Sequence, residues 1–155
     1  MRMSHFVVRD ACTPALAGTG REAVVRELVQ ALHAAGALPA ADLEDIVRAV
    51  LRREQLGSTG IGRGIAIPHS RYGSVSQLVG AVGLCKTPGK VPFDSIDGEP
   101  VDVFFLLISP QDRPGDHLRA LENVVQTARD DAFLERLRAS TTREEMWRAL
   151  FGDAG

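Results

Sequence analysis

The apolar residues of the N-terminal third of the chain recur at helical spacing. Within residues 21–35 they stand three or four positions apart, and Gly36 follows where a left-handed C-cap ends a helix. The same spacing returns after Pro39, in residues 43–51. The pattern predicts two successive amphipathic helices, and the second delivers Arg53 to the start of a glycine-rich run.

The C-terminal third shows the same periodicity. Pro114 opens a third predicted helix, for which we expect Asp116 to be the N-cap. Two shorter helices are predicted around residues 133–137 and 146–151, the second capped by Thr141 or Thr142. We expect both to pack onto the rest of the chain.

Continuous apolar runs between these helices are typical of buried strands. Residues 78–85 and 101–108 are rich in aliphatic, aromatic and β-branched side chains, and turn-forming residues flank both runs. Ile65–Ile67 is a shorter strand that Pro68 should end, and residues 91–93 form a short extended piece. The elements together predict an α/β layered sandwich, with a small mixed sheet and helices on both faces.

Composition narrows the class of protein. With 155 residues, 45% apolar and 25% charged, we expect residues 1–155 to form a single domain. The net charge of −2 predicts no attraction to nucleic acid. The apolar runs are too short for membrane insertion and the charged N-terminus is unlike a signal peptide, so we expect a cytoplasmic protein. Cys12 and Cys85 have no metal or redox spacing and are predicted to be small buried or half-buried side chains.

The run from Gly57 to His69 concentrates the candidate chemistry. Glycine permits close approach of the backbone to a ligand, and successive free N–H groups can hold an anion. Pro68 should place His69 at a strand edge facing solvent or a cleft, where a neutral imidazole offers a lone pair for phosphoryl transfer. The candidate phosphate loop consists of Gly57, Ser58, Thr59, Gly60, Gly62 and Gly64.

Each of these residues also has a purely structural interpretation. His69 could be an exposed histidine ending a strand, His117 a surface residue in a first helical turn, and Arg53 part of a solvated helix face. The glycine spacing matches neither a dinucleotide fingerprint nor a nucleotide P-loop, so no cofactor is expected. No closely spaced ligand pair supports a metal site.

Three segments resemble one known family. Residues 53–69 resemble the active-site signature of type-2 enzyme IIA domains of the bacterial phosphoenolpyruvate-dependent phosphotransferase system, the fructose, mannitol and nitrogen group. Residues 93–102 resemble the segment that leads into a core strand of that family, and residues 116–121 resemble its second histidine at a helix start. The resemblance is strongest over residues 23–150.

The resemblance implies a phosphohistidine carrier. It implies that His69 accepts a phosphoryl group from the histidine phosphocarrier HPr, by family precedent on Nε2. His117 and the N-terminus of its helix would stabilise that group, and Arg53 would stabilise its charge. The absence of sugar-binding IIB and membrane IIC segments favours a nitrogen-type IIA with a regulatory protein downstream.

Two alternatives stay open. The chain could be a fructose- or mannitol-type IIA that passes phosphate to a separate IIB domain, or a non-catalytic binding module with the same fold. Residues 70–72, Ser-Arg-Tyr, depart from the small continuation expected in many relatives, and Arg71 adds positive charge beside the proposed site. Ile61, Ile65 and Tyr72 are candidates for an apolar rim that docks HPr.

Overall fold

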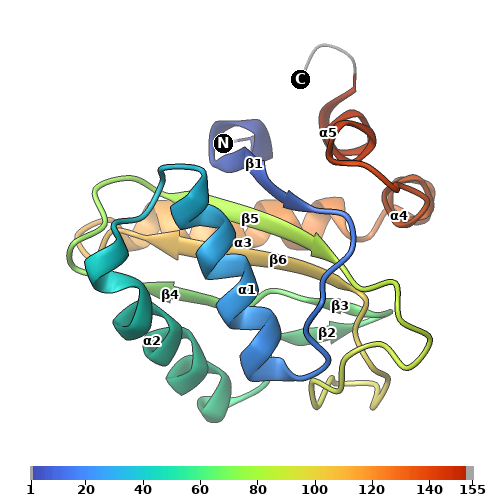
Figure 1. Cartoon of the computed structure of the whole chain (residues 1–155), viewed down its shortest axis with the longest axis horizontal. Coiled ribbons are helices and arrows are strands. Elements are labelled where there is room, and N and C mark those ends of the chain that lie inside the picture. The colour runs from blue at the N-terminus through green and yellow to red at the C-terminus, as the bar shows by residue number, and fades with distance from the viewer. Residues whose placement is uncertain (1, 153–155) are drawn as a thin grey trace.

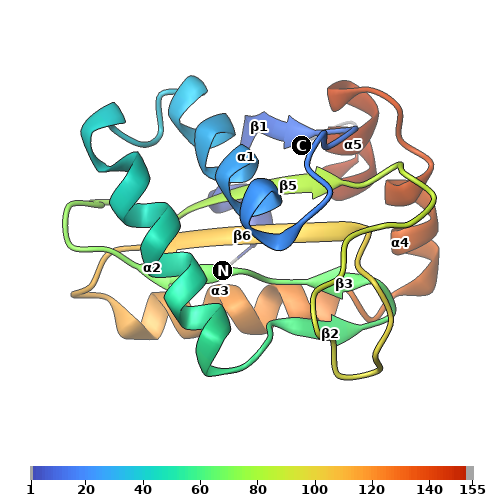
Figure 2. The ribbon, with the colours of Figure 1, turned by 60° about the horizontal axis from the view of Figure 1, so that its bottom comes forward.

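The computed structural model describes residues 2–152, in which a mixed sheet separates two layers of helices (Figures 1 and 2). The elements in chain order are η1 (Met3–His5), β1 (Val7–Thr13), α1 (Arg21–Ala34), η2 (Ala40–Asp42), α2 (Leu43–Leu56), β2 (Gly60–Gly62), β3 (Ile65–Ala66), β4 (His69–Arg71), β5 (Val79–Leu84), β6 (Val103–Ser109), α3 (Pro114–Thr127), α4 (Asp131–Arg138) and α5 (Arg143–Phe151). This arrangement confirms the predicted α/β sandwich.

The sheet is ordered β1-β5-β6-β3-β2, and β4 also pairs with β6. Strands β5 and β6 are antiparallel, whereas β3 and β4 both run parallel to β6. Ile65 pairs with Val103 and His69 with Leu107, so β3 and β4 keep one register across the break at Pro68. Strand β3 ends at Ala66, one residue before the predicted end, and pairing with β6 resumes at His69, directly after Pro68.

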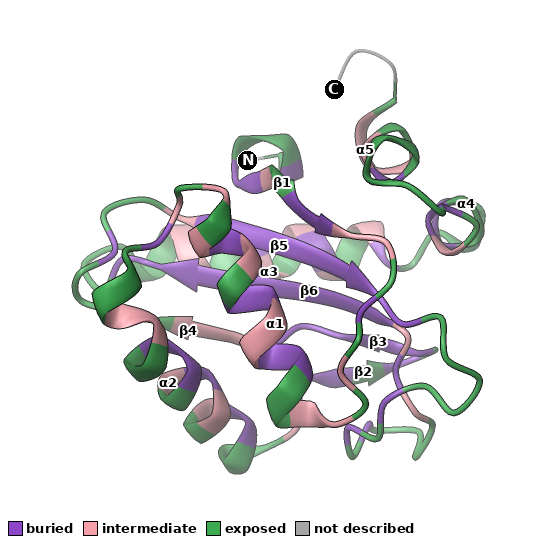
Figure 3. Ribbon diagram, viewed as in Figure 1, coloured by how far each residue is buried: buried purple, intermediate pink, exposed green. Residues whose placement is uncertain are grey.

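Alternate residues of β6 face opposite helical layers, as the two-residue period of a strand requires. Phe104, Leu106 and Ile108 pack into a cluster with α1 and α2. Val103, Phe105 and Leu107 pack into a second cluster with α3, α4 and α5. All of β5 and β6 is buried, whereas β4 at the sheet edge is only half-buried or exposed (Figure 3). Burial of each large side chain stabilises the fold by roughly 1.5–3 kcal/mol.

Helices α1, α2 and α3 begin and end close to the predicted positions, but the cap of α3 was wrongly predicted. Its N-cap is Arg113, because Pro114 occupies the first helical turn, where its missing N–H costs nothing. Asp116 lies inside the first turn and pairs with Arg119. At α5 the cap is Thr142, whose hydroxyl accepts a hydrogen bond from Glu145 N–H at 3.1 Å.

The N-terminal strand was absent from the prediction. Strand β1 runs parallel to β5, and an irregularity in its register separates Val7 from Cys12. Met3 and Phe6 are buried before it, and so anchor the start of the chain on the core. Cys12 and Cys85 are both buried free thiols, as predicted. No helix within residues 2–152 has the length and apolar character needed to span a membrane.

Candidate functional site

A pocket of about 440 Å³ opens at the sheet edge formed by β4. It lies where β4 meets the end of α2 and the first turn of α3, elements that Figure 1 shows on different layers. Its lining residues are Arg53, His69, Ser70, Arg71, Gln111, Pro114 and His117. The pocket thus brings together the three catalytic candidates taken from distant parts of the sequence.

His69 is oriented by a backbone carbonyl. Its Nδ1 lies 2.7 Å from the carbonyl oxygen of Ile67. A carbonyl only accepts hydrogen bonds, so Nδ1 carries the proton and the lone pair of the neutral ring is on Nε2. Burial lowers the pKa of His69, and the positive charge of Arg53 lowers it further against the opposing effect of the Ile67 hydrogen bond. His69 is therefore a neutral imidazole with a defined nucleophilic atom at pH 7.

His117 faces His69 across the pocket. The two ring centroids are 5.2 Å apart with an angle of 55° between the planes. Burial lowers the pKa of His117 to about 4, helped by His69 and by the positive charges of Arg71 and Arg53. Its Nδ1 is hydrogen-bonded to the hydroxyl of Ser109. The second imidazole is also neutral at pH 7, but its Nδ1 is bonded to a hydroxyl group and not to a carbonyl.

Arg53 reaches the pocket from the last turn of α2. Its Nη1 donates a hydrogen bond of 2.8 Å to the carbonyl of Gly57, the C-cap residue of that helix. The neighbouring Glu54 is 3% exposed, and its carboxylate accepts hydrogen bonds from the hydroxyl of Thr59 and, at 3.1 Å, from the Thr59 N–H. These contacts fasten the end of α2 to the following segment and so hold the Arg53 guanidinium beside the histidines.

The glycine-rich run folds as the hairpin β2–β3, and none of the six candidate loop residues is among the described residues that line the pocket. Several of its backbone donors are already engaged within the protein. Gly60 N–H donates to Ser58 Oγ at 3.0 Å, and Arg63 N–H donates to Asp97 at 2.9 Å. The Thr59 N–H bonds Glu54, as described above. The row of free N–H groups expected from the sequence is therefore not present at these residues.

Packing accounts for the glycines instead. A Cβ on Gly60 would lie 2.9 Å from Cα of Ser95, and Gly64 has a φ of +79°. A Cβ on Gly64 would also approach the Arg138 guanidinium at 2.8 Å, where that side chain is paired with Asp102. The hairpin thus requires glycine for close approach and a left-handed conformation. It contributes to the site indirectly, through the Glu54–Thr59 contacts.

Of the three residues that follow His69, Ser70 and Arg71 line the pocket and Tyr72 does not. Arg71 is exposed and lines the pocket, whereas the Tyr72 hydroxyl points to Asp45 at 3.4 Å. Ile65 is only 1% exposed and cannot contribute to an apolar rim, contrary to the expectation. The described large apolar side chains that are exposed are Leu56, Ile61, Ile96 and Leu118. Leu118 directly follows His117, and Leu56 lies three residues after Arg53.

Sequence reasoning missed Ser109 and the Ile67 carbonyl. Ser109 is fully buried and ends β6, one residue beyond the predicted strand. A signal was present, because Ser109 is the one polar residue closing the apolar run 103–108 before Pro110. The orienting role of the Ile67 carbonyl depends on the break between β3 and β4, and a main-chain carbonyl carries no comparable signal in the sequence.

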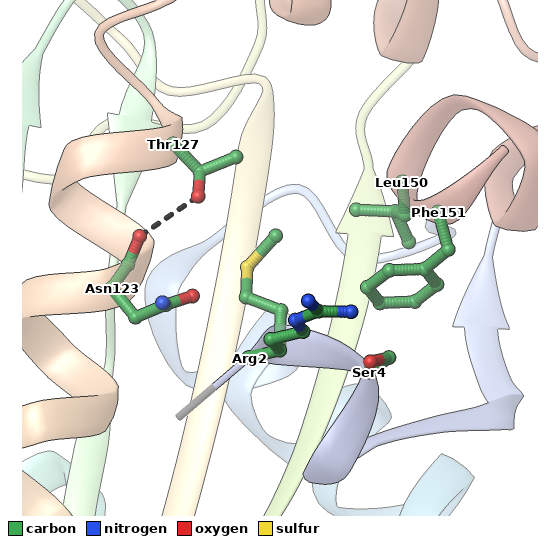
Figure 4. A pocket seen from close by; sticks show the side chains of 7 residues that line it. Arg2, Ser4, Asn123, Thr127, Leu150 and Phe151 are labelled. Atoms are coloured by element: carbon green, nitrogen blue, oxygen red, sulfur yellow. Dashed lines mark hydrogen bonds between the residues drawn. The ribbon is translucent and has the colours of Figure 1, made fainter.

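A second pocket, of about 410 Å³, lies between η1, α3 and α5 (Figure 4). Thr127 donates a hydrogen bond of 2.8 Å to the Asn123 carbonyl at its wall. Its described lining holds no histidine, cysteine or carboxylate, so it offers no comparable nucleophile. Over residues 2–152 there is also no group of three His, Cys, Asp or Glu arranged to hold a metal ion.

Comparison with known proteins identifies the family of the chain. Residues 10–152 match the family described as phosphoenolpyruvate-dependent sugar phosphotransferase system, EIIA 2. The chain is 31% identical over 150 residues to a nitrogen regulatory protein of Bradyrhizobium diazoefficiens, covering 97% of this chain and 95% of that protein.

Solved structures extend the likeness to the whole fold. The crystal structure of nitrogen regulatory protein IIA-Ntr from Neisseria meningitidis has a TM-score of 0.83 at 29% identity, covering 96% of this chain and 98% of that one. Enzyme IIAMtl of Escherichia coli, solved in complex with phosphorylated enzyme IIBMtl, has a TM-score of 0.69 at 21% identity, covering 92% and 95%. This second likeness concerns the fold alone. The chain belongs to the EIIA type-2 family of phosphoryl-transfer components of the phosphoenolpyruvate-dependent phosphotransferase system.

Proposed function

We propose that this protein is a phosphohistidine carrier in which Nε2 of His69 accepts a phosphoryl group from an HPr-type phosphocarrier, and that it acts as a nitrogen-type regulatory IIA. One observation carries the proposal. The hydrogen bond from Nδ1 of His69 to the Ile67 carbonyl leaves the lone pair on Nε2, in a pocket that also holds Arg53, Arg71 and His117.

The pocket suits the charge that phosphoryl transfer develops. The transition state is loose and spreads negative charge over the equatorial oxygens, so positioned donors contribute more than covalent chemistry. Arg53 and Arg71 offer permanently charged guanidinium groups. His117 adds a ring from the first turn of α3, whose N-terminus favours an anion. Candidate donors therefore surround the nucleophile on several sides.

The transfer balances without a proton leaving His69. The Nε2 lone pair forms the new N–P bond, and the N–P bond of the donor phosphohistidine breaks with its electron pair returning to the donor nitrogen. The proton of His69 stays on Nδ1 throughout and keeps its hydrogen bond to the Ile67 carbonyl. The proposed step therefore needs no general base, which agrees with a pocket where the second histidine has a lowered pKa.

The regulatory assignment rests on the relatives. Two of the similar proteins, from Bradyrhizobium and Neisseria, carry nitrogen regulatory names and align over nearly their full lengths. The likeness to IIAMtl, which was solved with its IIB partner, raises the alternative of transfer to a separate IIB domain. The higher identity to the first two favours a regulatory protein as the downstream partner.

The direct test is incubation with phosphoenolpyruvate, enzyme I and HPr, followed by quantification of acid-labile phosphate. We expect one phosphate per chain in the wild type and none in His69→Gln. His33→Gln is the matched control, because the Nδ1 of His33 also bonds a backbone carbonyl, that of Leu38 at 2.8 Å, but His33 does not line the pocket. This control should be labelled like the wild type.

Labelling of His69→Gln at the wild-type level would refute the acceptor assignment, and an unlabelled wild type would favour a non-catalytic binding module. Adding IIB domains of the fructose and mannitol systems to the labelled protein then distinguishes a regulatory IIA from a sugar-type IIA. Loss of the phosphate to either IIB domain would contradict the regulatory assignment while leaving the carrier chemistry intact.

A further inference from the structure

The two pocket histidines differ in what holds their Nδ1 atoms. His69 Nδ1 bonds a carbonyl, which can only accept, whereas His117 Nδ1 bonds the hydroxyl of Ser109, which can also donate. Within residues 2–152, the hydrogen bonds of both rings are made through Nδ1, and Nε2 of neither ring bonds another residue. The Nε2 atoms are the ones left for a ligand in the pocket.

Ser109 is placed at His117 by the geometry of the sheet. It is the last residue of β6 and pairs with Arg71 in β4, two positions after the Leu107–His69 pair. Since strand side chains alternate between faces, Ser109 lies on the same face as Leu107, the face covered by α3. Its main-chain carbonyl is also held, by the Tyr72 N–H at 2.9 Å. The hydroxyl is thus anchored on a fully buried strand residue.

The hydroxyl of Ser109 has a single partner in the described part of the chain, Nδ1 of His117. A buried hydroxyl that does not donate its hydrogen loses a hydrogen bond, so its best use here is as the donor to the Nδ1 lone pair. A neutral imidazole carries one N–H, and acceptance at Nδ1 places that hydrogen on Nε2. The ring then presents a donor to the pocket.

We propose that Ser109 is a positioning residue that fixes neutral His117 in the Nε2–H tautomer, so that this ring donates a hydrogen bond to the phosphoryl group on His69. The Nδ1 partners thereby give two similar rings opposite roles. The Ile67 carbonyl makes His69 a nucleophile, and the Ser109 hydroxyl makes His117 a hydrogen-bond donor. The consequence for transfer rests on the proposed carrier function, whereas the tautomer does not.

The tautomers can be read in the unphosphorylated protein from long-range ¹H–¹⁵N correlation spectra of the imidazole rings at pH 7.5. We expect His117 to carry its proton on Nε2 and His69 on Nδ1. In Ser109→Ala the Nδ1–H form of His117 should become populated, while Ser109→Thr, which keeps a hydroxyl, should retain the wild-type spectrum. Transfer from phosphorylated HPr should slow roughly tenfold in Ser109→Ala and stay close to wild type in Ser109→Thr.

Ser140→Ala is the matched control for losing a buried serine hydroxyl. Ser140 is 2% exposed, and its hydroxyl bonds the Arg136 carbonyl at 3.3 Å, far from the histidines in sequence and outside the pocket lining. It should change neither the His117 spectrum nor the transfer rate. A slower Ser140→Ala protein would show that loss of a buried hydroxyl alone explains the effect, and would overturn the proposal.

Three other results would overturn it. These are a wild-type His117 protonated on Nδ1, a Ser109→Ala protein with the wild-type tautomer, and an altered tautomer with unchanged transfer. If the wild type accepts no phosphate at all, the carrier function fails, but the ring spectra still decide whether Ser109 sets the tautomer. The two proposals therefore fail in distinguishable ways.

Discussion

The thirteen residues from Gly57 to His69 divide into two regions that use their side chains differently. In the hairpin, glycine is required by the backbone, as at Gly60 against Ser95 and at Gly64 with its positive φ. At the sheet edge, His69 is held by a backbone carbonyl while its Nε2 faces a pocket of polar side chains. A single sequence motif can thus combine a structural part with a chemical part. Substitutions in the hairpin should lower stability, whereas substitutions at the pocket should slow phosphoryl transfer.

The largest effect on chemistry beyond His69 itself is expected at His117. Removing one positioned donor from a transition state slows enzymatic reactions by about 10²–10³-fold, so His117→Ala should slow transfer from phosphorylated HPr by about a hundredfold. Rapid-quench measurement of acid-labile phosphate gives the rate. Wild-type transfer by this variant would remove His117 from the site.

The hairpin should show the reverse behaviour. Gly64→Ala forces a non-glycine residue to a φ of +79° and pushes a methyl group against the Asp102–Arg138 pair. We expect a loss of about 2 kcal/mol in the free energy of unfolding, measured by urea denaturation.

The control for this variant is Gly89→Ala, where a Cβ meets nothing within 4 Å and φ is not positive. It should stay within about 0.5 kcal/mol of wild type. Folded Gly64→Ala should still accept phosphate at nearly the wild-type rate. Unchanged stability with a large loss of transfer rate would instead indicate that the hairpin takes part in binding the phosphoryl group.

A smaller effect is expected from Arg53→Lys. Lysine keeps the charge but loses the planar fork that can bond a carbonyl and a phosphoryl group together. With the hydrogen bond to the Gly57 carbonyl weakened, transfer should slow by about tenfold, equivalent to ~1.4 kcal/mol. The adjacent Arg52→Lys is the control, since Arg52 is exposed and does not line the pocket. Equal effects at both positions would indicate a general charge effect.

The smallest change concerns pH. An ordinary histidine with a pKa of about 6.5 is mostly protonated at pH 6. Burial lowers the pKa of His69 and lowers that of His117 to about 4, so the neutral rings are favoured there. Transfer capacity should persist as pH falls past 6.5 and decline only through the lower pKa of His69. Proton titration of the ring signals by NMR checks this. A midpoint at or above 6.5 for His69 would contradict the desolvated pocket.

Stability should follow the same groups. Both rings have lower pKa values in the folded protein than in the unfolded chain, so the unfolded chain binds more protons as pH falls below about 6.5. The free energy of unfolding should therefore decrease between pH 6.5 and 4. His117→Gln, which cannot titrate, should reduce the slope, and an unchanged slope would contradict the lowered pKa of His117.

Sequence periodicity predicted most of the fold because each long helix buries one face and the two long strands are buried on both faces. Dense apolar patterns mark helices α1, α2 and α3 and strands β5 and β6, and each pattern fits only one type of secondary structure. Strand β1 was missed because Arg9 and Asp10 interrupt its pattern at exposed positions. Its pairing with β5 depends on a partner more than 60 residues away, which local periodicity does not report.

The site was predicted unevenly for a similar reason. His69, His117 and Arg53 are chemically distinctive and matched a family pattern, and the structure places all three at one pocket. The six loop residues do not line that pocket, and the sequence could not show this because glycines that cradle an anion and glycines that permit close packing look alike in sequence. Ser109 escaped notice because its role depends on strand register and on the first turn of α3 meeting it across the sheet edge.

The central claim is that the carbonyl of Ile67 selects Nε2 of His69 as the phosphoryl acceptor. The most direct measurement is the ³¹P–¹⁵N correlation of ¹⁵N-histidine-labelled protein after incubation with phosphoenolpyruvate, enzyme I and HPr. The account predicts one coupling, from phosphorus to Nε2 of His69. Nδ1 should remain protonated and hydrogen-bonded to the Ile67 carbonyl. Phosphorus coupled to Nδ1 of His69, or to either nitrogen of His117, would contradict it.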